Sequence, residues 1–121
     1  MSFYIKIGDH RQILYYADRP IYSFSVGTGV DKSWRKNPVW SPITIEVPTR
    51  PIREFELWIK NPVKIDMNLL LVHDSGKRVL EDHFLEGVTM SHFCEKRAIY
   101  ASVNVYSIIL VYKHAMMRDH T

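Results

Sequence analysis

One cysteine and three of the six histidines have the residue types and spacing for nucleophilic or metal chemistry. Cys94 stands two residues after His92, and His73 and His83 lie upstream. A neighbouring imidazole that accepts the thiol proton would make Cys94 a nucleophile. The same side chains are zinc-ligand types, but the paired-cysteine spacing of structural zinc sites is absent, so we expect no metal. A buried structural role is the commoner fate of a lone cysteine.

The stretch Ser91-His92-Phe93-Cys94, with His73 upstream, resembles the active site of L,D-transpeptidases. The run from Gln12 to Gly29 also resembles the opening strands of that fold. The resemblance implies that a histidine activates the cysteine, which attacks a peptide carbonyl and forms a thioester. Phe93 stands where the family has glycine, and Lys96 stands where it has arginine. A cysteine transpeptidase that uses His73, His92 and Cys94 is therefore kept as an alternative.

A second candidate site is the stretch from Lys32 to Lys64, which contains all three tryptophans. Its seven bases and three acids give it a charge of +4, against +3 for the whole chain. Lysine and arginine attract the phosphates of RNA or of anionic lipids, and exposed tryptophans stack on bases or lie at membrane interfaces. The residues predicted to bind nucleic acid or lipid are Lys32, Trp34, Arg35, Lys36, Arg50, Arg53, Trp58, Lys60 and Lys64.

Trp58 is the most informative residue of this basic stretch. Apolar residues at every second position from Phe55 to Ile59 predict a strand with one buried face. Trp58 would then lie on the opposite face, where solvent is expected and where an indole usually has a partner. The alternative is that Trp34 and Trp40 fold back into the core and the bases form an ordinary solvated surface.

Alternation of apolar and polar residues is the main signal along the chain. It predicts strands at 3–7, 13–16, 22–26, 43–47, 55–59, 65–71, 79–85 and 98–112, with hairpin turns at 8–10 and 74–77 and a loop at 27–42. Gly87 predicts a break, followed by one or two helical turns between Ser91 and Arg97. The final strand is long enough that we expect a bulge near Ser107 or a helical part.

The chain is predicted to be mainly β. We expect a single small sandwich or barrel-like domain of antiparallel strands over residues 1–121, with one or two short helices and a frayed tail at 113–121. Its 121 residues, 46% hydrophobic and 24% charged, suit one globular core. The single cysteine excludes an intrachain disulfide, and we see no signal peptide or bilayer-spanning stretch, so we expect a cytosolic protein. No phosphate loop, metalloprotease helix or carboxylate pair stands out. We therefore expect no enzyme and no cofactor.

From about Ile43 to Leu110 the chain resembles the matrix protein of bornaviruses and of their nyamivirus relatives. The resemblance is carried by Ile43-Thr44-Ile45-Glu46-Val47 and by the run from Lys96 to Ser107. It implies a non-enzymatic protein of a negative-strand RNA virus that self-assembles and binds anionic membrane and RNA or the nucleocapsid. The implied locations are the host cytoplasm, the inner face of its membrane and the virion. A structural virion or phage component without lipid or RNA contact is the other alternative.

Overall fold

The computed structural model describes residues 1–21, 40–75 and 78–118 of the 121-residue chain. The expected strand at 22–26 and nearly all of the expected loop at 27–42 lie outside these residues. The described elements are β1 (Ser2–Ile7), β2 (His10–Leu14), β3 (Tyr16–Ala17), β4 (Ile43–Pro48), α1 (Arg53–Lys60), β5 (Ile65–Val72), β6 (Val79–Arg97), β7 (Asn104–Val111) and β8 (His114–Arg118).

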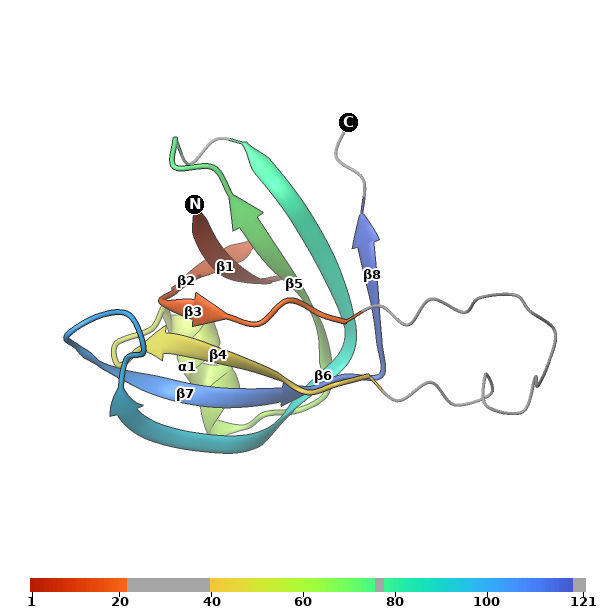
Figure 1. Cartoon of the computed structure of the whole chain (residues 1–121). Coiled ribbons are helices and arrows are strands. Elements are labelled where there is room, and N and C mark those ends of the chain that lie inside the picture. Colours follow the sequence, from red (N-terminus) through yellow and green to blue (C-terminus); the bar gives the residue numbers. More distant parts are fainter. Residues whose placement is uncertain (22–39, 76–77, 119–121) are drawn as a thin grey trace, which may run out of the picture.

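The strands form one antiparallel sheet that β6 divides into two halves. The order is β2-β1-β5-β6-β7-β4-β3, and β8 also pairs with β6. The first part of β6 lies between β5 and β8, and its second part pairs with β7 (Figure 1). Ile5 of β1 and Ile45 of β4 belong to the same core cluster, so the two halves face each other across one core. The predicted mainly β fold, a sandwich or barrel-like domain of antiparallel strands with one or two short helices, is confirmed as eight antiparallel strands in one sheet with one short helix in the described residues.

The continuity of β6 corrects the predicted break at Gly87 and the helical turns after Ser91. Gly87 has a φ of 65°, a left-handed conformation that glycine adopts without a steric penalty. Its N–H donates to Asp66 Oδ1 at 3.0 Å. A register shift between Met90 and His92 follows in the ladder with β7. The strand therefore bends at Gly87 and continues from one half of the sheet into the other.

The segment predicted as a strand at 55–59 is the helix α1, which is a second correction. Phe55 and Trp58, three residues apart, lie on one buried face, whereas Leu57 is 55% exposed. Prolines favour this outcome, because Pro51 cannot donate to a strand ladder and Pro62 disfavours a further helical residue before it.

A buried side chain from β2 supports the start of α1. The N-cap residue, Ile52, makes no side-chain cap hydrogen bond. Its own N–H donates to Oε1 of Gln12 at 2.6 Å, and Nε2 of Gln12 donates to the carbonyl of Ile13 at 2.8 Å. Gln12 therefore joins the entry of the helix to the β1–β2 hairpin, and it is 3% exposed. The acidic first turn and the basic last turn of α1 also suit the helix dipole.

The C-terminal third differs from the single long strand predicted at 98–112. Residues 98–103 form a loop, β7 follows, and the chain turns at Tyr112 and Lys113 into β8. The ladder of β6 with β7 shows its register shift at Met90 and not near Ser107. Residues 114–118 belong to the tail that we expected to be frayed, yet they pair with residues 82–86 of β6.

Candidate assembly surface

The cysteine and histidine candidates do not form a catalytic group. Cys94 and His92 are both exposed on the second part of β6, and Nδ1 of His92 lies 2.9 Å from the hydroxyl of Ser91. His73 follows β5, and its N–H donates to the carbonyl of Arg78, directly before β6 begins. His73 and Cys94 therefore lie at opposite ends of β6. The expectation of a buried cysteine is wrong, because Cys94 is exposed.

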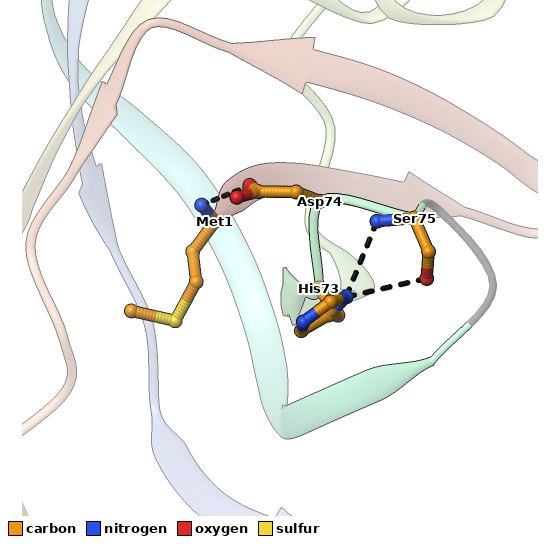
Figure 2. A network of polar contacts seen from close by, with 4 residues as sticks. All are labelled: Met1, His73, Asp74 and Ser75. Carbon is orange, nitrogen blue, oxygen red and sulfur yellow. Dashed lines mark hydrogen bonds and ion pairs between the residues drawn. The ribbon is translucent and has the colours of Figure 1, made fainter.

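The polar contacts of His73 belong to the turn after β5, as Figure 2 shows. Nδ1 of His73 accepts the N–H of Ser75 at 3.2 Å and lies 3.3 Å from its hydroxyl. The carboxylate of Asp74 pairs with the Met1 amino group. The hydrogen bond from the Met1 amino group to Asp74, together with the positive charge of that amino group, holds the pKa of Asp74 below its ordinary value. The Met1–Asp74 pair joins the start of β1 to the turn after β5.

The histidines and the cysteine also do not converge on a metal site. His83 is 4% exposed, and its Nε2 lies 2.9 Å from Oε1 of Glu81. The imidazole is therefore engaged in a contact between side chains of β6. Over residues 1–21, 40–75 and 78–118, no three His, Cys, Asp or Glu side chains group in a way that could hold an ion.

Within residues 40–64, the described part of the basic stretch, the two tryptophans do not form the outward aromatic surface that we predicted. Trp58 is 5% exposed, and its indole N–H donates to the carbonyl of Val63 at 2.9 Å, so the prediction of an outward indole is wrong. Trp40 is half-buried and packs edge-on against His114, with ring centroids 5.2 Å apart. Four of the predicted binding residues lie outside the described residues: Lys32, Trp34, Arg35 and Lys36.

The remaining bases of that stretch are exposed around α1. Arg53 and Lys60 lie at the two ends of the helix, Arg50 precedes it, and Lys64 precedes β5. Lys60 pairs with Glu56 at 3.5 Å across one helical turn. Their predicted binding of an acidic ligand stays a prediction.

Among the described strands, the second part of β6 has a free edge. It pairs with β7 on one side from Thr89 to Arg97, whereas β5 reaches only Val88 and β8 only Glu86. No strand of the described chain pairs with its other side. All seven residues from Ser91 to Arg97 are exposed. Such an edge carries unpaired N–H and C=O groups that can pair with another chain.

Apolar side chains are exposed on this edge and on the loop that follows it. Phe93 is 44% exposed and packs on Tyr106, with ring centroids 4.8 Å apart. The loop at 98–103 exposes Ile99, Val103 and Tyr100, and Tyr100 is 80% exposed. Exposed apolar groups beside a free edge are typical of a protein-binding surface.

A further edge lies on the other half of the sheet. β8 pairs with β6 on one side, and none of the other described strands pairs with its second side. Met116 and Met117 of β8 are both exposed. The guanidinium of Arg118 lies 4.5 Å from the centre of the Phe84 ring. The two halves of the sheet therefore offer unlike edges, one at residues 91–97 of β6 and one at β8.

Known structures resemble the chain along almost its whole length. Hcp1 from Flavobacterium johnsoniae matches with a TM-score of 0.65 and 13% identity, covering 97% of this chain and 94% of that one. A chain of the PVC sheath-tube complex, an extracellular contractile injection system, matches with a TM-score of 0.60 and 16% identity, covering 96% and 87%. The cap that terminates the tube of the anti-feeding prophage gives 0.61 and 15%, covering 98% and 88%. This chain has an Hcp-like fold. No protein-family model matches the sequence, and no curated protein matches it.

These matches overturn the viral prediction. The resemblance of residues 43–110 to bornavirus matrix proteins is wrong, because the structures that match over nearly the whole chain include Hcp1, a chain of a sheath-tube complex and a type six secretion system protein. The predicted locations in the host cytoplasm, at the inner face of the membrane and in the virion are wrong for the same reason. The matches support neither a membrane nor an RNA partner. In residues 1–21, 40–75 and 78–118, no helix has the length and apolar character to cross a bilayer.

Proposed function

We propose that the chain is a non-enzymatic structural subunit that assembles with copies of itself into the tube of a contractile injection or type VI secretion apparatus. The near full-length likeness to Hcp1 and to a sheath-tube complex supports this assignment. The predictions of self-association and of a non-enzymatic role agree with it. Among the sequence-based alternatives, a structural component without lipid or RNA contact comes closest.

The free edge of β6 is the observation that carries the proposal. A strand added to residues 91–97 gains main-chain hydrogen bonds, and exposed Phe93 adds apolar contact. A second copy that adds a strand here would use a different edge of its own, such as that of β8. Contacts between unlike edges are head-to-tail, and they close into rings or continue as filaments. Stacked rings form a tube.

The test compares the oligomeric state of the full chain with that of an edge variant. Wild type is expected to form concentration-dependent ring-sized oligomers in sedimentation velocity and electron microscopy. Cys94→Lys puts a charge on the free edge, as natural edge strands do to prevent pairing, and should shift assembly to at least tenfold higher concentration. Leu57→Lys, on the exposed face of α1, is the matched control and should assemble like wild type. Wild type that stays monomeric at all concentrations contradicts the proposal.

A further inference from the structure

A buried carboxylate lies on the outer face of the sheet. Ile45 and Val47 of β4 point into the core, so Glu46 between them points to the opposite face. In the ladders it stands beside Tyr16 of β3 and Ser107 of β7. An outer-face glutamate is ordinarily solvated, yet Glu46 is 1% exposed. Burial of a carboxylate costs free energy unless hydrogen bonds or opposite charges compensate for it, so the contacts of Glu46 must explain why it is buried.

The side-chain oxygens of Glu46 contact the end of β6 and the loop at 98–103. Oε1 accepts the N–H of Ile99 at 3.2 Å. Oε2 accepts no hydrogen bond from the part of the chain that the structure describes, but it lies 3.6 Å from the ammonium of Lys96. Nearby, the ring of Tyr100 lies 6.0 Å from that of Tyr16, which adds a second contact between loop and sheet. The loop therefore folds back over the outer face and covers the carboxylate.

The loop is also closed on itself, so that its exposed side chains are held in one arrangement. The N–H of Ala98 donates to the carbonyl of Val103 at 2.9 Å, which joins its two ends. Ile99, Tyr100 and Val103 remain exposed, and none of them is charged. A mobile loop would lose conformational entropy on binding, whereas a loop already ordered by folding would not. From outside the loop, Glu46 contacts it through the Ile99 N–H, and Tyr16 contacts it through the ring of Tyr100.

A second copy of this chain is the partner that fits the loop. The loop continues directly from Arg97, so a copy that adds a strand to the free edge of β6 lies beside it. The near full-length likeness to Hcp1 and to a chain of a sheath-tube complex favours a second copy as the neighbour. Charge alone selects no partner, because the edge exposes Lys96 and Arg97 beside Glu95.

We propose that Glu46 is a positioning residue for self-assembly. Its buried carboxylate holds the 98–103 loop in the conformation in which Ile99, Tyr100 and Val103 contact a neighbouring copy. The inference rests on the proposed function, because the contact requires that copies assemble. Buried ionic groups of this kind can select one arrangement of a segment among several.

The test uses two readouts on the full chain, only one of which depends on assembly. Backbone hydrogen exchange of dilute, monomeric protein should show the Ile99 amide protected in wild type and at least tenfold faster in Glu46→Ala, while the amides of β7 are unchanged. Glu46→Gln keeps the size and one acceptor oxygen but loses the attraction to Lys96. Both variants should raise the concentration for half-assembly at least tenfold.

Two exposed variants keep the inference testable if Glu46→Ala folds poorly. Lys96→Met removes the ionic partner, and Tyr100→Ser removes the most exposed loop side chain; both should weaken assembly and leave the fold unchanged by circular dichroism. If wild type assembles and all four variants assemble at the same concentration, the inference is overturned and the proposed function stands. If wild type never assembles, the proposed function falls and the assembly role of Glu46 falls with it.

Discussion

At the scale of single residues, Trp58 shows how one side chain can reverse an interpretation. Its indole packs beside Phe55, with ring centroids 5.7 Å apart, and its N–H donates to the carbonyl of Val63. The tryptophan is therefore part of the core and closes the end of α1. It contributes to stability, and the surface that binds a partner must lie elsewhere.

Replacement of Trp58 should be costly in a way that replacement of its neighbour is not. Trp58→Ala removes a buried aromatic ring and should lower the free energy of unfolding by about 3–5 kcal/mol. Trp58→Phe keeps most of the packing and loses one hydrogen bond, for about 1 kcal/mol. Urea unfolding measures both, with exposed Leu57→Ala as the control, expected to stay within about 0.5 kcal/mol of wild type. Equal losses for Leu57→Ala and Trp58→Ala would argue against the helix.

At the scale of elements, β6 is the strand on which the architecture depends. Its first part is covered by neighbours on both sides, and its second part has one neighbour and an open edge. The bend at Gly87 separates these two parts. The bulge between Ile65 and Met67 of β5 lies opposite this bend.

A side chain at position 87 should destabilise the bend through its backbone. Gly87 has a positive φ, and a Cβ there would lie 3.6 Å from Cβ of Lys113, an ordinary contact. The cost is therefore conformational, and Gly87→Val should lower the free energy of unfolding by about 1–2 kcal/mol. Gly87→Asn is the matched variant, since asparagine tolerates this conformation better and should lose less. Urea unfolding measures both variants. If Gly87→Val is as stable as wild type, the bend does not depend on the left-handed conformation of Gly87.

At the scale of the whole molecule, two tyrosines on different parts of the fold link stability to alkaline pH. The hydrogen bond from Tyr16 to Asp18, followed by burial and nearby negative charge, raises the pKa of Tyr16 to about 12. Burial raises the pKa of Tyr112 to about 12 as well. In the unfolded chain both would titrate near the ordinary value of 10.

The folded state should therefore lose stability as the pH rises above about 10. Between that value and about 12 the unfolded chain releases these two protons and the folded chain keeps them, so unfolding is favoured. The stabilisation is complete below pH 10 and declines toward pH 12. Tyrosinate absorbance measured against pH should show a late-titrating fraction that shrinks in Tyr16→Phe. A single transition near pH 10 for every tyrosine would contradict this expectation.

The sequence by itself was enough to find most strands. Alternation marked β1, β4 and β5 correctly, because one face of each lies against the core and the period-two pattern records that burial locally. The same pattern failed at 55–59. That segment has the two-residue spacing of Phe55 and Leu57 and also the three-residue spacing of Phe55 and Trp58. The helix buries Phe55 and Trp58 together in the core, whereas a strand would have put them on opposite faces.

The candidate assembly surface was decided only by the tertiary structure. The local pattern of residues 91–97 predicts helical turns and a candidate cysteine site, and it carries no signal of an open edge. Whether a strand edge stays open depends on where strands far along the chain end. Here β5 and β8 both stop short of Thr89. The burial of Glu46 has the same origin, since a loop some 50 residues away covers it. Local periodicity records which side chains are buried, whereas long-range pairing determines which backbone groups remain available to another copy.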